Sequence, residues 1–452
     1  MASTFFLVIG LLTAYMTVPC QSFLQAVHPD KPISSSVDPS SYFQLPKPSQ
    51  DSWYLPPPGW ESESPGTVLR VRDHAYKGPK GIPDYYDVFQ VLYRTTDSHS
   101  RPNYAATTVF IPESHKTCAE TFRNVTEPKN CSYALLSYQL PYDSACFDAS
   151  PSYNLQIGEP YGDIGIMLRR GYFVSVPDYE GPRASYGASI LAGFTILDQF
   201  RALKATLGDY GFQTNVSRFA MWGYSSGGTA TEFAAELAAQ YAPDVKLVGT
   251  VIGGLAGNVS VSLDIVNAHD VAGLLVHGLV GLTKEYPEQR KFLDSRLKKE
   301  GMYNISEFYL AQQLTGSDGL AQYLYQDIYE YFQDGRNDVF APTMMVPLNR
   351  EGLAGLQGTP NMPVFLYQAV RDEMCPIEYV DPVVQRHCEN SGNIWYQRNM
   401  LGAHNLEGSN GRQRGLDFLT DVVEGTNITG RPETGCKIED GTWDYDIRIP
   451  YH

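Results

Sequence analysis

A glycine-flanked serine is the residue whose surroundings most clearly suggest chemistry. Ser225 lies in 223–227 (GYSSG), a G-x-S-x-G pattern that is weak alone because glycine and serine are common. An apolar run (218–222, RFAMW) precedes it and an Ala-rich stretch (229–241) follows. A strand, a tight turn and a helix in that order would present the hydroxyl as a nucleophile above a sheet edge. The N-terminal end of that helix and the backbone N–H of Ser226 would then stabilise an oxyanion.

A serine hydroxyl needs a base to remove its proton, so a histidine and an orienting carboxylate must follow. In the fold that uses this turn, the chain order is serine, acid, histidine. Asp372 follows an apolar run (364–369, VFLYQA), and His404 lies in a glycine-containing loop after the last predicted strand. This order and placement favour Asp372 as the acid and His404 as the base.

Three other residues compete for these roles. Glu373, next to Asp372, and the more distant Asp381 are alternatives for the acid. His387 is an alternative base, but it lies in a predicted helix (383–388), where a histidine is more often a surface residue.

No cofactor or metal is expected. The sequence has no G-x-x-x-x-G-K-[ST] loop and no H-E-x-x-H, and no glycine pattern with dinucleotide-binding spacing follows a strand. None of the cysteine spacings is typical of zinc.

The elements that must position these residues alternate along the chain. Ile196, Phe200, Leu203 and Leu207 repeat at helical spacing between apolar runs. The predicted strands are 87–93, 105–111, 132–138, 172–176, 218–222, 247–252, 364–369 and 394–397, the last expected to be the final strand. Such alternation predicts an α/β protein with a mostly parallel sheet flanked by helices.

The expected domain organisation is a core with one insertion. Residues 66–259 and 351–452 would form the core, and 260–350, which are mainly helical in pattern, a lid or cap. The Pro- and Ser-rich segment 21–65 is expected to be an extended arm over the core.

The first 20 residues indicate export. An uncharged apolar run (5–18) is too short for a comfortable membrane span, and cleavage after Cys20 would leave Gln21 as the first residue. Sequons for N-glycosylation agree with secretion. They are Asn124, Asn130, Asn215, Asn258, Asn304 and Asn427.

Six cysteines remain after that cleavage, an even number that suits an oxidising compartment. They fall into two groups of three, so if all six are paired, an odd number of disulfides must join the two groups. Six cysteines can be paired in fifteen ways. The cysteines are Cys118, Cys131 and Cys146, then Cys375, Cys388 and Cys436.

Composition excludes several classes of protein. With 43% hydrophobic and 19% charged residues in 452, the chain is neither disordered, collagenous nor coiled coil. The formal net charge of −16, from 34 Lys+Arg and 50 Asp+Glu, argues against nucleic acid as a partner. No obligate protein partner is evident.

Several motifs together resemble the fungal secretory lipase family. They include 222–228 (WGYSSGG), its continuation 230–237 (ATEFAAEL), 241–244 (YAPD), 93–96 (YRTT) and 137–139 (SYQ). The resemblance runs from about residue 65 to the Cys436 region. It implies an α/β-hydrolase fold with a helical lid, and a secreted lipase or esterase.

Residue by residue, the resemblance implies Ser225, Asp372 and His404 as the catalytic triad. It also implies Asp143, in 141–144 (PYDS), as the partner of Ser226 in the oxyanion hole; a protonated Asp143 would need burial to raise its pKa.

The resemblance implies a disulfide between Cys388 and Cys436. Cys118 and Cys131 lie in a segment that looks longer than in the family and would bridge each other. That leaves Cys146 and Cys375 for the crossing bridge, three residues after Asp143 and Asp372 respectively.

The expected function is ester hydrolysis through an acyl-enzyme, with acylglycerols as the first expectation and a transient contact with a lipid interface. The insertion is rich in Tyr, Gln and Asp, whereas a lid that meets oil is usually more apolar. The alternative is therefore an esterase that deacetylates a specific metabolite such as a trichothecene, as some family members do. A non-catalytic binding module on the same fold is the remote alternative.

Overall fold

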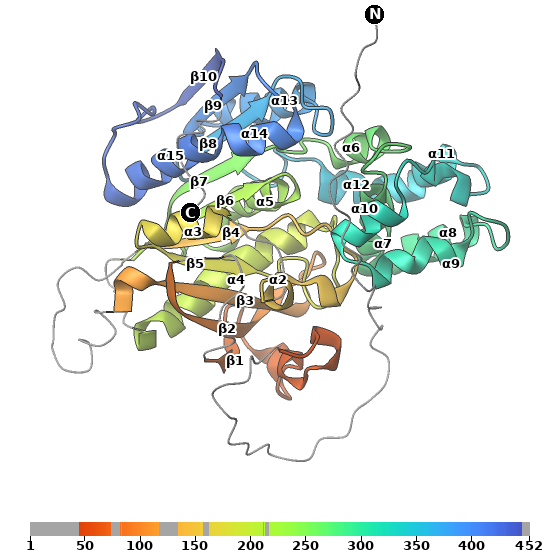
Figure 1. Ribbon diagram of the computed structural model, residues 1–452, viewed down its shortest axis with the longest axis horizontal. Coiled ribbons are helices and arrows are strands. Elements are labelled where there is room, and N and C mark those ends of the chain that lie inside the picture. Colours follow the sequence, from red (N-terminus) through yellow and green to blue (C-terminus); the bar gives the residue numbers. More distant parts are fainter. Residues whose placement is uncertain are drawn as a thin grey trace, which may run out of the picture.

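The computed structural model describes residues 45–73, 82, 84–116, 134–156, 162–210, 212 and 217–444. In this part of the chain, ten strands form one sheet that runs through the molecule (Figure 1). The strands are β1 (Val68–Arg72), β2 (Tyr85–Thr96), β3 (Pro102–Pro112), β4 (Ala134–Gln139), β5 (Phe173–Pro177), β6 (Arg218–Tyr224), β7 (Leu247–Gly253), β8 (Val364–Ala369), β9 (Ile394–Asn399) and β10 (Cys436–Gly441).

The sheet order is β1-β2-β3-β5-β4-β6-β7-β8-β9-β10. β1, β2 and β3 pair antiparallel, as do β3 and β5, whereas every pair from β5 to β10 is parallel. The carboxyl ends of β4 to β9 therefore meet at one edge, and the loops that follow these strands lie side by side.

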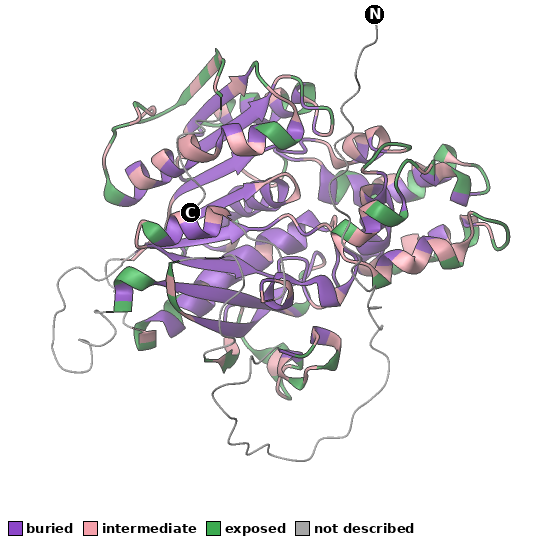
Figure 2. Ribbon diagram, in the orientation of Figure 1, coloured by how far each residue is buried: buried purple, intermediate pink, exposed green. Residues whose placement is uncertain are grey.

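Side chains of the central strands alternate between two apolar cores, so helices cover both faces of the sheet. The central strands are coloured as buried in Figure 2. In β6, Phe219 and Met221 join one core, and Ala220 and Trp222 join the other. The first core packs against α4 (Ser189–Thr206), α5 (Ser226–Tyr241) and α13 (Ile377–Glu389); the second packs against α3 (Gly162–Arg169) and α15 (Arg412–Glu424). Two short helices, α2 (Pro151–Asn154) and α14 (His404–Asn410), complete the core.

Residues 259–352 form a helical layer beside the sheet, here called the cap (Figure 1). It has an apolar cluster of its own, which includes Leu275, Leu279 and Phe308. Its helices are α6 (Val259–Ile265), α7 (Gly273–Glu285), α8 (Pro287–Arg296), α9 (Ile305–Phe308), α10 (Gly316–Gln322), α11 (Arg336–Val339) and α12 (Pro342–Gly352).

The described part of the arm, from residue 45, forms short 3-10 turns against the core rather than one extended strand. Ser49 donates from both its backbone N–H and its hydroxyl to Asp148, and Tyr54 hydrogen bonds to Ser152. Residues 1–44, with the expected signal peptide, lie outside the described residues. None of the helices in the described ranges has the length and apolar character needed to cross a bilayer.

The mostly parallel sheet flanked by helices confirms the expected fold class. One expectation is wrong: 394–397 is not the final strand, because β10 adds to β9 in parallel at the sheet edge. The sequence of β10 has no apolar pattern that would predict a strand, because none of its side chains is buried.

Candidate active site

Ser225 occupies the tight turn between β6 and α5. Its φ of 58° and ψ of −125° are strained for a non-glycine residue, and its backbone N–H donates to Gly253 O at 3.0 Å. The turn tolerates no side chain at Gly227, where a Cβ would lie 2.0 Å from the carbonyl oxygen of Gln139. The glycine thus lets α5 begin directly against β4, with Ser225 at its first turn.

A continuous chain of hydrogen bonds links Ser225, His404 and Asp372. His404 Nε2 lies 2.8 Å from Ser225 Oγ, and His404 Nδ1 lies 2.8 Å from Asp372 Oδ2. The three residues follow β6, β8 and β9, so the parallel sheet brings together side chains that are distant in sequence. The arrangement can move a proton from the serine hydroxyl to the imidazole and hold the imidazolium against a carboxylate.

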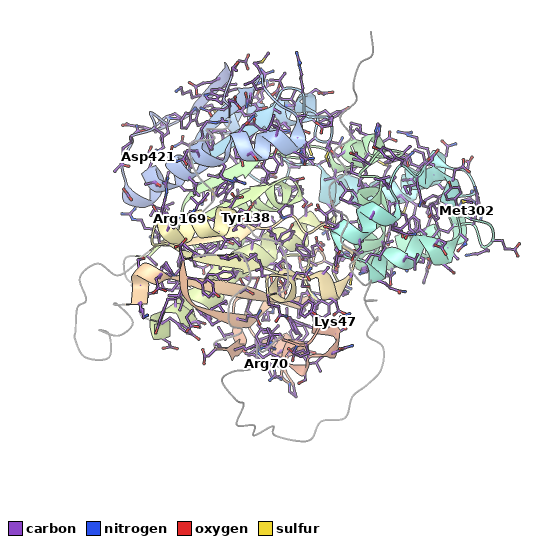
Figure 3. All side chains as sticks on the ribbon, in the orientation of Figure 1. Lys47, Arg70, Tyr138, Arg169, Met302 and Asp421 are labelled. Carbon is purple, nitrogen blue, oxygen red and sulfur yellow. A yellow bond between two sulfur atoms is a disulfide. The ribbon has the colours of Figure 1, made fainter. Side chains whose placement is uncertain are left out.

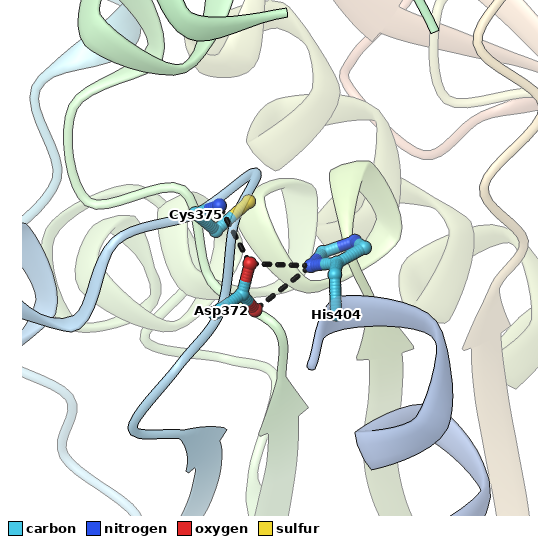
Figure 4. A group of neighbouring side chains, drawn as sticks. All are labelled: Asp372, Cys375 and His404. Carbon is cyan, nitrogen blue, oxygen red and sulfur yellow. Dashed lines mark hydrogen bonds and ion pairs between the residues drawn. The ribbon is translucent and has the colours of Figure 1, made fainter. Parts of the chain in front are cut away.

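The Asp372 carboxylate is held by several donors. Oδ1 accepts the backbone N–H groups of Met374 (3.0 Å) and Cys375 (2.7 Å), and Oδ2 accepts the side-chain amide of Gln368 (2.9 Å). Figure 4 shows this carboxylate between Cys375 and His404. Burial alone would lower the pKa of His404, but Cys375 and Asp372 beside the ring raise it above its ordinary value.

The competing residues take other positions. Glu373 accepts the backbone N–H of His404 (2.9 Å), so it anchors the histidine loop without reaching the ring. Asp381 accepts a hydrogen bond from the Tyr396 hydroxyl (2.9 Å). The expectation of a surface His387 is wrong: this residue of α13 is buried, 2.5 Å from Glu232.

Asp143 lies beside Ser226, as the resemblance implies. The Ser226 hydroxyl donates to Asp143 Oδ1, and the positive φ of Asp143 (45°) turns the loop after β4 toward the first turn of α5. Burial raises the pKa of Asp143, although Ser226, His404 and Tyr186 oppose the rise. A protonated Asp143 next to the backbone N–H of Ser226 would be a second donor for an oxyanion.

A cavity of about 870 Å³, its open mouth included, adjoins Ser225 and Ser226. Its walls are mostly apolar and come from both the core and the cap. The cap contributes Val259, Leu263, Leu274 and Leu348, among others, and the core contributes Ala192 and Ala230. A substrate that reaches Ser225 would therefore be enclosed between the two layers.

The cysteines differ in part from the expectation. Cys388 and Cys436 form a disulfide with a Cα–Cα distance of 5.8 Å. The expected bridge between Cys146 and Cys375 is wrong, because Cys375 is a buried free thiol while Cys146 is disulfide-bonded. The sulfur of Cys375 lies within 4.8 Å of ligand atoms of Asp372 and His404, the Cys375 N–H donates to Asp372, and the residue is part of the cavity wall. Cys118 and Cys131 lie outside the described residues.

The sequons differ in accessibility. Asn427 is exposed after α15, whereas Asn304 caps α9 with its side-chain oxygen and Asn258 accepts a hydrogen bond from Ser260 (2.7 Å). The other three, Asn124, Asn130 and Asn215, lie outside the described residues.

Two buried groups in the described ranges have donors close enough to hold a metal ion. One is Asp372, Cys375 and His404, of which Asp372 and His404 belong to the hydrogen-bond chain above. In the other, Glu232 pairs with His387, and both oxygens of Glu236 accept backbone N–H groups at 2.5 and 2.6 Å. The carboxylates of both groups thus already accept hydrogen bonds within the protein.

Comparison with known proteins agrees with this fold. The model of the Secretory lipase family matches residues 154–430. The "Trichothecene C-3 esterase" of Fusarium sporotrichioides is 40% identical over 87% of this chain and 88% of its own. "Lipase A" of Arthroderma benhamiae is 31% identical over 92% of this chain and 87% of its own. The X-ray structure of Candida antarctica lipase A shares the fold, with a TM-score of 0.73 and 24% identity over 88% of this chain and 91% of that one.

The fold and these relatives define a carboxylic ester hydrolase of the α/β-hydrolase class. The chain belongs to the secretory lipase family.

Sequence reasoning missed two residues at this site. The sequence predicts a bridge for Cys375, although its position three residues after Asp372 indicates the same loop. Glu180 follows β5, and a carboxylate at the carboxyl end of a parallel strand was the available signal. Its burial depends on segments that pack over it only in the folded chain.

Proposed function

We propose that the protein hydrolyses esters through an acyl-enzyme formed on Ser225. The observation that carries this proposal is the hydrogen-bond chain from Ser225 Oγ through His404 to Asp372. In the proposed reaction the Ser225 oxygen attacks the ester carbonyl while its proton passes to His404 Nε2. His404 then gives this proton to the departing alcohol, and a water molecule hydrolyses the acyl-enzyme by the reverse route.

Asp372 keeps the His404 ring oriented and stabilises its protonated form. The negative charge on the carbonyl oxygen is stabilised by the backbone N–H of Ser226 and by Asp143. The raised pKa of Asp143 supports this role, since a carboxylic acid can donate where a carboxylate would repel.

We infer that the substrate is an ester of a compact metabolite such as an acetylated trichothecene. The support comes from relatives: besides the 40% identical trichothecene C-3 esterase, a "Probable trichothecene esterase SAT6" of Stachybotrys chartarum is 35% identical. Acylglycerols are the second candidate, supported by the 31% identical Lipase A.

The test is hydrolysis of p-nitrophenyl esters from acetate to palmitate, of an acetylated trichothecene and of emulsified triglyceride, each with Ser225→Ala as control. A metabolite deacetylase should hydrolyse p-nitrophenyl acetate and the acetylated trichothecene best and should not hydrolyse the emulsified triglyceride. Turnover of long chains that rises at the oil–water interface would instead support a lipase. A folded protein that hydrolyses none of these esters would refute the enzymatic proposal.

We also infer secretion with cleavage after Cys20. The family description, the Cys388–Cys436 disulfide and the exposed sequon at Asn427 support an oxidising, glycosylating route. N-terminal sequencing of the protein recovered from culture medium should begin at Gln21.

A further inference from the structure

The loop that carries Asp143 is held by the cap. Asp143 follows β4, and two positions later Ala145 forms two backbone hydrogen bonds with helix α7. The N–H of Ala145 donates to His277 Nδ1 (3.0 Å), and its carbonyl oxygen accepts from Lys284 Nζ (2.5 Å). Helix α7 thus binds both backbone polar groups of a residue next to the candidate oxyanion hole.

The two α7 residues lie on one helical face. Seven positions separate His277 from Lys284, close to two helical turns, so the side chains point the same way. Lys284 Nζ also donates to Arg183 O (2.6 Å) and Ala184 O (3.3 Å), in the loop that follows β5. One face of α7 therefore contacts the loops after β4 and β5, at the sheet edge where Ser225 lies.

The His277 ring acts as a hydrogen-bond acceptor. It is fully buried, and this burial, helped by the nearby charge of Lys284, lowers the pKa of His277 to about 3. The ring is therefore neutral near pH 7, and since Nδ1 accepts, its proton is on Nε2. Nε2 has no hydrogen-bond partner among the described residues; a Cβ at Gly319 would lie 1.9 Å from it. The Ala145 N–H is thus the polar group that this ring serves.

The acceptor at His277 bears on the position of Asp143. The Ala145 N–H is buried, so without an acceptor it would be left unsatisfied at a cost in free energy, and the loop would shift to find a partner. A donor to an oxyanion must lie within a narrow distance range of it, so even a small shift of the loop weakens that contact. Ser144 adds a further tie to the cap, since its hydroxyl donates to Leu314 O (2.9 Å).

We propose that His277 is a positioning residue for the oxyanion hole: it accepts the Ala145 N–H and thereby keeps Asp143 in place beside Ser226. This inference rests on the proposed ester hydrolysis at Ser225. It gives the cap a part in building the oxyanion hole besides lining the cavity. It also requires α7 to stay docked during the reaction, because a lid movement that carried α7 away would release the Asp143 loop.

The first test replaces His277 in the whole protein, with p-nitrophenyl acetate as substrate. Leucine has a similar size but no acceptor, so His277→Leu should lower kcat by about 10- to 100-fold with little change in KM. The side-chain oxygen of asparagine can take the place of Nδ1, so His277→Asn should restore most of kcat. An unchanged kcat in His277→Leu, or equal losses in both variants, would overturn the proposal.

His115→Leu is the matched control for the loss of a buried histidine. His115 is also buried and also hydrogen bonds to a backbone group, the carbonyl oxygen of Tyr210 (3.1 Å). It follows β3, which runs antiparallel to β5, so it lies at the opposite edge of the sheet from Ser225. His115→Leu should therefore leave kcat unchanged per folded molecule, and a loss like that of His277→Leu would point to a general effect on packing and overturn the proposal.

A double-mutant cycle shows whether the effect of His277 passes through Asp143. In Asp143→Ala the oxyanion is stabilised by the backbone N–H of Ser226, so adding His277→Leu should lower kcat by less than about twofold further. A further loss as large as in the wild-type background would mean that His277 does not act through Asp143.

Amide hydrogen exchange separates this inference from the proposed function, because it needs no turnover. Peptides that cover residues 141–149 should exchange faster in His277→Leu than in the wild type and in His277→Asn. Unchanged exchange, or faster exchange with unchanged kcat, would overturn the role of His277. A wild type that hydrolyses no ester, with the expected pattern of exchange, would overturn only the proposed reaction.

Discussion

At the scale of single residues, the site depends on how each carboxyl group is surrounded. Asp372 accepts three hydrogen bonds besides that of His404. Asp143 and Glu180 are buried near the same site, and this burial raises the pKa of both carboxyl groups. Burial thus biases two acids near Ser225 toward their neutral form.

Replacing Asp372 by Asn should lower kcat for p-nitrophenyl acetate by about 10⁴-fold with little loss of folded protein. The amide keeps the size of the side chain but stabilises the wrong tautomer of His404. Asp381→Asn is the matched control, because Asp381 contacts Tyr396 and not the triad. A comparable loss in both variants would contradict the assignment of Asp372.

The pH dependence of kcat/KM should reveal the environment of His404. Only the neutral imidazole accepts the Ser225 proton, so activity is lost as pH falls through the pKa of His404. Because this pKa is raised, half-maximal activity should lie above 6.5, the ordinary value for histidine. Glu373→Gln, which contacts only the backbone of His404, should leave the midpoint in place. A wild-type midpoint at or below 6.5 would count against a His404 stabilised in its charged form.

At the scale of elements, the parallel strands bring the side chains of the site together at one edge of the sheet. Ser225, Asp372 and His404 follow β6, β8 and β9, and Asp143 and Glu180 follow β4 and β5. Since all these strands end at one edge, loops as distant in sequence as those of Ser225 and His404, 179 positions apart, come into contact. The edge strand β10 is different: it buries little and is tied to α13 by the Cys388–Cys436 disulfide.

Replacing Cys388 and Cys436 together by Ser should therefore destabilise the β10 edge. The disulfide closes a loop with a sequence separation of 48, and its loss should lower the free energy of unfolding by up to about 4 kcal/mol. Denaturant titration of the double variant, with reduced wild type as the comparison, measures this. Unchanged stability in both would mean that hydrogen bonds to β9 alone hold β10.

At the scale of the whole molecule, the cap and the core share one cavity. Helices α6, α7 and α12 supply apolar side chains to its wall, and α7 is also tied to the core by Lys284. In the proposed reaction, the cap would limit which acyl and alcohol groups fit beside Ser225. Met302 lies at the outer end of the cap, far from the sheet and 78% exposed (Figure 3).

Enlarging a cavity side chain should change chain-length preference. Leu274→Trp places more volume in the wall, so kcat/KM for p-nitrophenyl octanoate should fall by about tenfold or more relative to acetate. Met302→Trp adds similar bulk on the exposed side of the same cap and should leave the ratio unchanged. Equal ratios in both variants would show that acyl groups bind elsewhere.

Much of the fold can be predicted from the sequence, because apolar periodicity and turn residues depend only on positions that are close together in the chain. The alternation of strands and helices and the motif around Ser225 specify the parallel sheet and its turn. Such reasoning failed where burial is set by distant segments. The polar edge strand β10 gives no apolar signal, and His387 is buried only because Glu232 of α5 faces it.

The sequence by itself determined the order of the elements, the strained serine turn and the residue types available at the strand ends, because these depend on neighbours along the chain. Only the tertiary structure decided which side chains meet there. It left Cys375 a free thiol beside His404 and buried His387 against Glu232, because sheet order and helix packing set the distances between segments remote in sequence.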